Sequence, residues 1–194
     1  MPRPSLKLQR VDEILNALES CILAEGLSST SLETIATTAN MKRSILRHYI
    51  GNRDDIIIAL GQRFFKQSQA QWQTLLDQLP ETHASQWLVE GLLFFKDTNQ
   101  LKQYQLSEAL FAEARRLPEL KDVIGEWTER FINDLTYHLA KDYPKTTEKA
   151  CRQVALGLYS LYFLDESYTA LFPKTPMTND LQATALRLIQ SLSA

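Results

Sequence analysis

The sequence predicts an all-helical protein with an N-terminal three-helix domain, which contains a helix-turn-helix, and a larger C-terminal helical bundle, about nine helices together. Apolar residues recur at spacings of three and four along most of the chain, and no stretch shows the sustained alternation of a half-buried strand. Glycine and proline are scarce, and the prolines lie between the periodic stretches or at their first turns. Both observations favour helices joined by short connections.

Apolar stripes and capping residues predict where the helices begin and end. The first stripe is formed by Val11, Ile14, Leu15, Leu18 and Ile22, and Gly26 follows it as a stop. Thr30 precedes Glu33 by three residues, which is the spacing of a capping box. Asn52 is expected to cap the fourth helix and Pro144 to open the eighth. The predicted helices cover residues 11–22, 32–39, 43–50, 53–79, 83–96, 101–116, 118–135, 144–171 and 177–192.

The composition is that of an ordinary globular protein. Of the 194 residues, 44% are apolar and 23% are charged, and the formal net charge is −2. The N-terminus lacks the apolar segment of a signal peptide and no apolar run could span a membrane, so we expect a cytoplasmic protein. Cys21 and Cys151 lie in apolar helical patterns without metal-site spacing. We therefore expect buried free thiols, no metal and no cofactor.

The segment 39–42, Ala-Asn-Met-Lys, separates two short predicted helices. This is the geometry of a helix-turn-helix, which presents its second helix to the major groove of DNA. Such a turn usually needs one residue in the left-handed conformation, which glycine adopts most easily and asparagine next. We therefore expect Asn40 to have a positive φ.

Basic side chains follow this turn. Residues 42–53 contain four lysines or arginines and no acid, although the whole chain is slightly acidic. In the third helix Leu46 and Ile50 lie one turn apart and are expected to pack inward, so that Arg43 and Arg47 share the opposite face. The pattern predicts a local DNA-binding surface, and the alternative is a basic face that is merely solvated.

Residues 39–56, ANMKRSILRHYIGNRDDI, resemble the run AGVSKGTLYYHFGSKEEL of the TetR family of bacterial regulators. Upstream positions that also fit are Arg10, Ile14, Ala17, Gly26, Thr30, Ser31, Ile35 and Ala36. The resemblance covers residues 10–60, without an insertion. It implies a DNA-binding transcriptional regulator, usually a repressor, that binds a palindromic or pseudo-palindromic operator as a homodimer and responds to a small molecule; an activator is the alternative.

The resemblance also implies that the start of the third helix contacts bases and its end contacts phosphates. Arg43 can bridge guanine O6 and N7, Ser44 can bond to either base type, and Ile45 can contact a thymine methyl. Arg47 and Arg53 suit phosphates, and the N-terminus of the fourth helix would add backbone donors. The candidate DNA-binding residues are Thr30, Ser31, Lys42, Arg43, Ser44, Ile45, Arg47, His48, Tyr49 and Arg53.

The sequence departs from the family's run at several positions. Asn40 stands in place of glycine, Arg47 of tyrosine, Ile50 of phenylalanine, Arg53 of lysine and Lys42 of serine. The last change loses a helix cap and adds a charge. None of these changes removes the donors that phosphate binding needs, whereas the sequence preference is expected to change.

We expect two domains, a DNA-binding domain over 1–52 and a domain for effector binding and dimerisation over 53–194. The eighth helix is apolar on more than one face, which favours a second buried surface and hence a homodimer through helices eight and nine. A monomer in which this helix is simply central is the alternative. The candidate interface residues are Leu156, Leu158, Tyr159, Tyr162, Phe163, Leu181 and Leu188.

Aromatic residues gather in the fourth to seventh helices, where members of the family hold an effector. Carboxylates beside aromatic faces would suit a cationic or polar ligand. Aromatic stripes at helical spacing are more often core, so core packing is the alternative for each. The candidate pocket residues are Phe64, Trp87, Glu90, Tyr104, Glu108, Phe111, Trp127, Phe131 and His138.

Two other classes of protein compete with the regulator. One is an all-helical small-molecule-binding protein or enzyme without DNA activity, and the other is a helical adaptor. His48, His83 and His138 lie far apart and lack zinc-binding spacing, and the sequence has no phosphate-binding loop or nucleophile motif. We therefore expect no catalytic residues, and a gel-shift assay would separate both rivals from the regulator.

Overall fold

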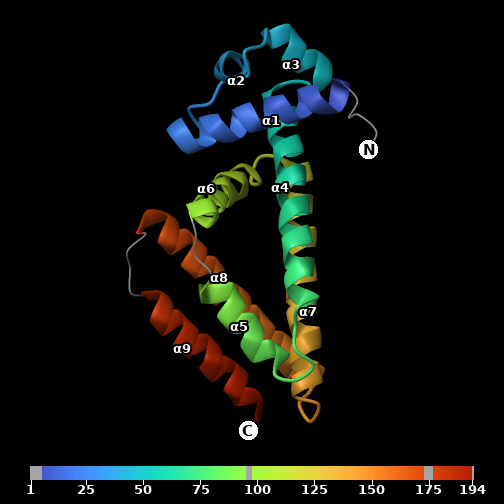
Figure 1. Cartoon of the computed structure of the whole chain (residues 1–194), viewed down its shortest axis with the longest axis vertical. Helices are drawn as coiled ribbons and strands as arrows, with labels where there is room; N and C mark the ends of the chain where they lie inside the picture. Colours follow the sequence, from blue (N-terminus) through green and yellow to red (C-terminus); the bar gives the residue numbers. More distant parts are fainter. Residues whose placement is uncertain (1–5, 95–97, 173–176, 194) are drawn as a thin grey trace. The chain divides into compact units, whose positions relative to one another are not determined.

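The computed structural model describes the backbone of residues 6–94, 98–172 and 177–193, with the side chains of all of these except 91–94, 98–100 and 170. All regular structure in these residues is helical, which confirms the predicted all-α class (Figure 1). The helices are α1 (Leu6–Glu25), α2 (Leu32–Thr38), α3 (Arg43–Tyr49), α4 (Arg53–Leu76), α5 (Ala84–Phe94), α6 (Thr98–Glu113), α7 (Pro118–Asp142), α8 (Glu148–Leu171) and α9 (Met177–Gln190), followed by the 3₁₀ turn η1 (Ser191–Ser193).

The start of α8 differs from the expectation. The Oγ1 atom of Thr147 accepts a hydrogen bond from the backbone N–H of Ala150 at 3.3 Å, and this side chain caps the helix. Pro144 lies three residues earlier, in the turn that follows α7. The prediction that Pro144 opens the helix was wrong, because a capping hydroxyl and not the proline fixes the first turn.

The chain forms two compact units. Unit 1 consists of Met1–Ser68 and Gln105–Ile124, and unit 2 consists of Gln69–Tyr104 and Gly125–Ala194. The grouping differs from the expected division after residue 52, because the first part of α4 and the turn between α6 and α7 belong to the same unit as α1, α2 and α3. The assignment of DNA binding to residues 1–52 stays a prediction.

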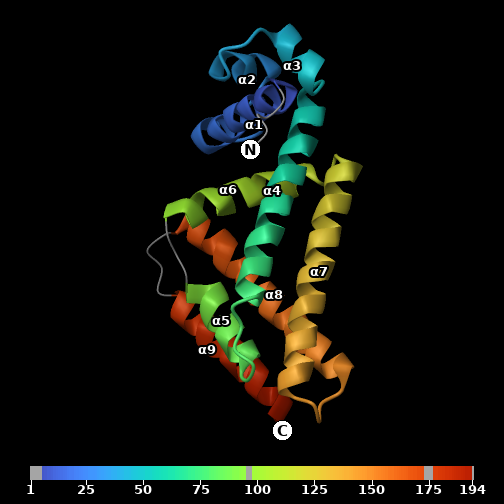
Figure 2. The same cartoon turned by 45° about the vertical axis from the view of Figure 1, so that its right-hand side comes forward.

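In unit 1, α2 and α3 lead into the start of α4, with α1 beside them (Figure 2). The inward stripes predicted for these helices form the core: fully buried side chains include Ile14, Leu18, Ile35, Leu46, Ile56, Ile57 and Leu60. Gly61 has no side chain where α4 meets the start of α7, and a Cβ there would collide with the side chain of Leu120. The start of α7 thus packs closely on α4.

In unit 2, α9 packs along α5 and α8 (Figure 1). Phe131 is 2% exposed, and its ring lies 4.3 Å from that of Trp72 and 5.7 Å from those of Tyr159 and Tyr162. Cys151 is fully buried beside this cluster and is a free thiol, as is Cys21 in unit 1. The core of unit 2 is therefore strongly aromatic on its α7 and α8 side.

Two candidate interface residues are buried within their own chain. Leu158 is 4% exposed and Leu181 is 7% exposed, so their predicted place in a dimer seam was wrong. The spacing of apolar residues along α8 does not show which face of the helix packs against the rest of unit 2. Leu156 and Leu164, by contrast, are 43% and 44% exposed.

Other interface candidates are partly used inside unit 2. The hydroxyl of Tyr159 lies 3.2 Å from Oγ1 of Thr128, and that of Tyr162 donates to Oε1 of Glu166 at 2.5 Å. Burial raises the pKa of Tyr162, and the Glu166 carboxylate raises it further. Phe163 is half-buried with its ring 6.3 Å from that of Tyr159, and Leu188 is also half-buried. These side chains contribute to packing within one chain.

Two leucines of α8 test this division between core and surface. Leu158→Ala should lower the free energy of unfolding by about 2–5 kcal/mol, because it leaves a cavity in the core of unit 2. Leu156→Ala should lower the free energy of unfolding of the single chain by about 0.5 kcal/mol or less, because that side chain is exposed within its own chain. Urea denaturation of both variants at one low protein concentration measures the difference, and equal losses would contradict the assignment.

Candidate DNA-binding surface

The turn between α2 and α3 has the predicted left-handed residue. Asn40 has a φ of 51°, which confirms the expectation for this position. Its N–H donates to the carbonyl of Thr37 at 3.0 Å, and the N–H of Met41 donates to that of Ala36 at 2.9 Å. These bonds close α2 and set the direction in which α3 leaves the turn.

The start of α2 differs from the expectation by one residue. Ser31, not Thr30, is the cap, and its Oγ accepts from the N–H of Thr34 at 3.1 Å. Thr30 is 3% exposed, and its hydroxyl donates to the carbonyl of Gly26 at 2.9 Å. The capping-box interpretation was therefore wrong, and we remove Thr30 from the candidate DNA contacts because its hydroxyl is buried and already bonded.

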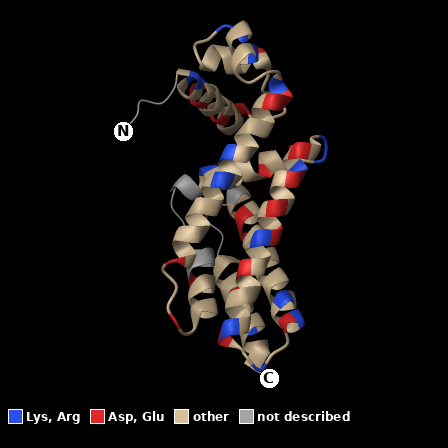
Figure 3. Ribbon diagram, turned by 90° about the vertical axis from the view of Figure 1, so that its right-hand side faces the viewer, with Lys and Arg blue, Asp and Glu red and all other residues tan. Residues whose placement is uncertain are grey.

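Helix α3 separates one buried side chain from an exposed polar face. Leu46 is fully buried, and Ile50 is half-buried at the end of the helix. Lys42 precedes the helix without a side-chain capping bond, as the loss of serine predicted. The exposed side chains are Lys42, Arg43, Ser44, Ile45, Arg47 and His48, and Tyr49 is half-buried. Figure 3 marks the charged positions on the ribbon.

Arg53 has a structural role that the sequence did not predict. Its Nε donates to the carbonyl of Thr30 and its Nη2 to that of Leu27, both at 2.7 Å. The Nη1 atom lies 3.8 Å from the carboxylate of Asp54, and 26% of the side chain is exposed. Two of the three guanidinium nitrogens of Arg53 are therefore bonded to the loop between α1 and α2, and its contact with a DNA phosphate stays a prediction.

The first turn of α4 is fixed by reciprocal capping. Oδ1 of Asn52 accepts from the N–H groups of Asp54 and Asp55, at 2.8 and 3.1 Å, which confirms Asn52 as the cap. Oδ2 of Asp55 accepts from the N–H of Asn52 at 2.8 Å. Gly51 has a φ of 135°, and a Cβ there would collide with Asp55. This glycine permits the sharp change of direction from α3 to α4.

A distant arginine meets the same turn. Arg116, between α6 and α7, donates from Nη1 and Nη2 to the two carboxylate oxygens of Asp54 at 2.6 and 2.8 Å, and Nη2 also bonds to Glu113 at 2.6 Å. These bonds hold the pKa of Asp54 below its usual value. Sequence reasoning missed this pair because its members lie 62 positions apart with no shared motif.

The candidate pocket residues are divided between the two units. In unit 1, Phe64, Glu108 and Phe111 are half-buried, and the ring of Phe111 lies 6.3 Å from that of the buried Phe65. In unit 2, Tyr104 and Phe131 are buried, and Trp87, Trp127 and His138 are half-buried. The division means that neither unit by itself contains the whole predicted set.

Individual pocket candidates have ordinary structural surroundings. Glu90 is exposed and accepts a long hydrogen bond of 3.5 Å from Gln86, so its predicted place in an interior pocket was wrong. Phe131 fills the core, as the alternative interpretation predicted. Nδ1 of His138 is buried without a hydrogen bond, and burial lowers the pKa of this side chain.

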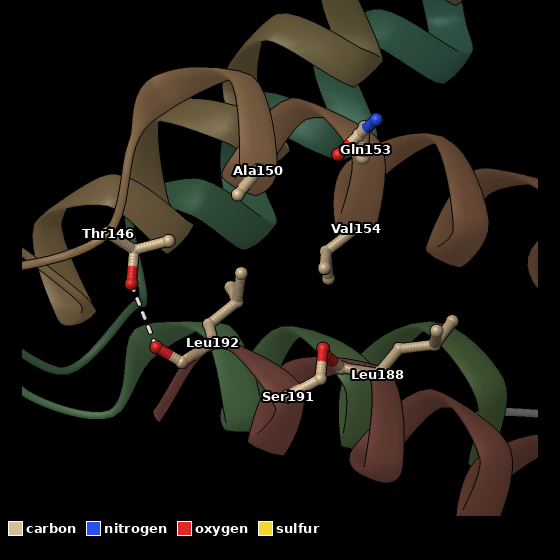
Figure 4. A pocket seen from close by; sticks show the side chains of 7 residues that line it. All are labelled: Thr146, Ala150, Gln153, Val154, Leu188, Ser191 and Leu192. Atoms are coloured by element: carbon tan, nitrogen blue, oxygen red, sulfur yellow. Dashed lines mark hydrogen bonds between the residues drawn. The ribbon is translucent and has the colours of Figure 1, made fainter. Parts of the chain in front are cut away.

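Unit 2 has a recess that the sequence did not indicate. It has a volume of about 370 Å³ and lies between the start of α8 and the end of α9 with η1 (Figure 4). A hydrogen bond of 2.8 Å from Oγ1 of Thr146 to the carbonyl of Leu192 closes one end. The lining residues are Thr146, Ala150, Gln153, Val154, Leu188, Ser191 and Leu192.

Among the described helices, none is both long and apolar enough to cross a membrane.

Arg53 and Arg47 form a matched pair for the structural assignment. Arg53→Ala should lower the free energy of unfolding by about 2 kcal/mol or more, because two charge-assisted hydrogen bonds are lost and two carbonyls lose their partner. Arg47→Ala should change it by about 0.5 kcal/mol or less, because Arg47 is exposed. Thermal and urea unfolding measure both. Unchanged stability in Arg53→Ala would contradict the structural role of this side chain.

Comparison with known proteins finds similarity to several transcriptional regulators. No protein-family model matches the chain. The HTH-type transcriptional regulator BetI of Paraburkholderia phymatum is 24% identical over 165 residues, which are 83% of this chain and 81% of that protein. A transcriptional regulator from Rhodococcus sp. Rha1 has a TM-score of 0.77 at 14% identity, covering 94% of this chain and 95% of its own.

A protein from Mesorhizobium loti, described as a TetR-family transcriptional regulator, has a TM-score of 0.70 at 16% identity, covering 97% of this chain and 96% of its own. The similarity in fold to these proteins thus extends along most of the chain. The resemblance to the TetR family is confirmed, and the chain has the fold of a TetR-type transcriptional regulator.

Proposed function

We propose that this protein is a DNA-binding transcriptional regulator, a ligand-responsive repressor that binds a palindromic or pseudo-palindromic operator as a homodimer. The observation that carries the proposal is the exposed face of α3. Arg43, Ser44 and Arg47 are exposed on a short helix whose Leu46 is fully buried, and the left-handed turn at Asn40 holds that helix against α2. This arrangement presents donors to a groove while the backbone stays fixed.

Each exposed side chain of α3 has a chemistry that suits DNA. The fork of Arg43 matches guanine O6 and N7, and Ile45, 37% exposed, offers an apolar contact to a thymine methyl. Arg47, His48 and Tyr49 follow one turn later and suit phosphate oxygens. With Thr30 removed, the proposed contacts are Ser31, Lys42, Arg43, Ser44, Ile45, Arg47, His48, Tyr49 and Arg53.

The homodimer is supported by the outer face of α8. Leu156 and Leu164 lie eight residues apart on α8 and are both more than two-fifths exposed, so the helix presents apolar side chains away from its own core. A Cβ on Gly157 would lie 2.9 Å from the side chain of Leu188 on α9, so α8 and α9 approach closely. Two such pairs of helices would bury the exposed leucines in a four-helix bundle.

The response to a small molecule and the repressor role rest on the family resemblance. The pocket candidates that remain are Phe64, Glu108 and Phe111 in unit 1, and Trp87, Tyr104, Trp127 and His138 in unit 2. The rival function, a helical small-molecule-binding protein or enzyme without DNA activity, makes no use of the basic face of α3. A gel shift at several salt concentrations separates the two, since only the regulator requires salt-dependent DNA binding.

Removing the side chains of Arg43 and Arg47 should change DNA binding in different ways. Arg43→Ala should lose about 1–3 kcal/mol of discrimination at one base pair in each half-site and keep most non-specific binding. Arg47→Ala should weaken all sequences about equally and lower the salt slope by roughly one unit per protomer. Fluorescence anisotropy with a selected operator and random DNA measures both. An unchanged specificity ratio in Arg43→Ala would show that α3 does not read bases through this residue.

The dimer is tested on the outer face of α8. The native chain should have twice the 22.2 kDa chain mass in light scattering at micromolar concentration. Leu164→Glu should give the single chain mass without loss of helicity in circular dichroism, because it adds a charge to the proposed seam. Tyr137→Glu, at an exposed position of α7, is the control and should keep the native mass. A native monomer would overturn the proposed dimer.

A further inference from the structure

The carboxylate of Glu33 is not used where the capping-box spacing would put it. Because Ser31 caps α2, Glu33 is the second residue of the helix, and it does not close the cap. Its Oε2 lies instead 3.1 Å from Nη1 of Arg43, the first residue of α3. An acid on α2 thus holds the side chain that we propose reads bases.

The backbone on both sides of this ion pair is firmly held. Ile35 on α2 and Leu46 on α3 are fully buried in the core of unit 1, and the turn between the helices is closed at Asn40. The side chains themselves are open to solvent, 66% exposed for Glu33 and 53% for Arg43. The contact therefore spans two fixed helices at a surface that DNA can reach.

The geometry of the contact leaves one edge of the guanidinium available. Glu33 accepts from Nη1, whereas a bidentate guanine contact needs two parallel N–H groups. The Nε and Nη2 atoms form the other edge of the fork, and neither donates to a described side chain in this structure. A guanine can therefore bind this edge while the carboxylate stays in place.

Glu33 also changes the charge of the proposed DNA surface. It is an exposed acid in contact with Arg43, and DNA binding would bring it toward phosphates. A negative charge there opposes sequence-independent attraction to the DNA backbone. The same side chain thus favours one arginine conformation and weakens non-specific binding, and both effects increase specificity.

We propose that Glu33 is a positioning residue for base recognition, whose carboxylate holds Arg43 with its Nε–Nη2 edge available to a guanine. This inference rests on the proposed function. Glu33 acts through Arg43 and need not touch DNA. Arg43 held in this way fits a guanine in the major groove of each half-site.

The test compares four proteins in their binding to a selected operator, to the same operator with the guanine replaced, and to random duplex DNA, across a salt series. They are the native chain, Glu33→Gln, Glu33→Asp and Glu25→Gln. The last removes an exposed acid at the end of α1 and is the charge control. Circular dichroism checks that each variant is folded. We expect all of them to fold, because Glu25 and Glu33 are exposed.

Glu33→Gln should reduce discrimination against the replaced guanine by roughly two- to thirtyfold per dimer, the range expected for losing one exposed ion pair in each protomer. It should also tighten binding to random DNA. Glu33→Asp keeps the charge but shortens the side chain, so it should lose discrimination with non-specific binding unchanged. Glu25→Gln should keep the native discrimination.

A second comparison isolates the coupling. In an Arg43→Ala background, Glu33→Gln should cause no further loss of discrimination, since the side chain that it positions is gone. Full native discrimination in both Glu33 variants, or an equal additional loss without Arg43, would overturn the inference and leave the regulator intact. A native chain that discriminates no sequence at any salt concentration would instead overturn the proposed function.

Discussion

Arg53 donates two hydrogen bonds of 2.7 Å to carbonyls of the loop between α1 and α2, and these bonds join that loop to the first turn of α4. The same turn is capped by Asn52 and held by Arg116 through Asp54. Since α3 is only seven residues long, its own hydrogen bonds could not fix its orientation. The direction of the proposed recognition helix therefore depends on how the start of α4 is bonded.

This arrangement separates the basic residues of 42–53 by role. Arg53 is hydrogen-bonded to the loop between α1 and α2, whereas Arg43 and Arg47 are exposed on α3. Arg116 links the turn between α6 and α7 to the end of α4 that carries Asp54, all within unit 1. A shift of that turn would act directly on the first turn of α4. The two hydrogen bonds from Arg116 fix the orientation of the Asp54 carboxylate as well as its distance.

Local patterns predicted the parts of the fold that depend on local chemistry. The positive φ of Asn40, the burial of Leu46 and the cap at Asn52 all follow from sequence neighbours. Expectations failed where two adjacent residues compete for one role, as Thr30 and Ser31 do. They also missed partners that are distant in sequence, as for Arg53 with its carbonyls. The buried Leu158 shows a third cause, since periodicity cannot tell a helix's own core from a partner's surface.

In the proposed regulator, two copies of the exposed α3 face read DNA together. Selection of bound duplexes from a random pool by the full-length chain tests it most directly, since it assumes no operator. We expect enrichment of an inverted repeat with a guanine at matching positions of both half-sites, their centres separated by about 34–36 Å or a multiple of it along the helix axis. A pool without an enriched motif, or a motif without two-fold symmetry, would contradict it.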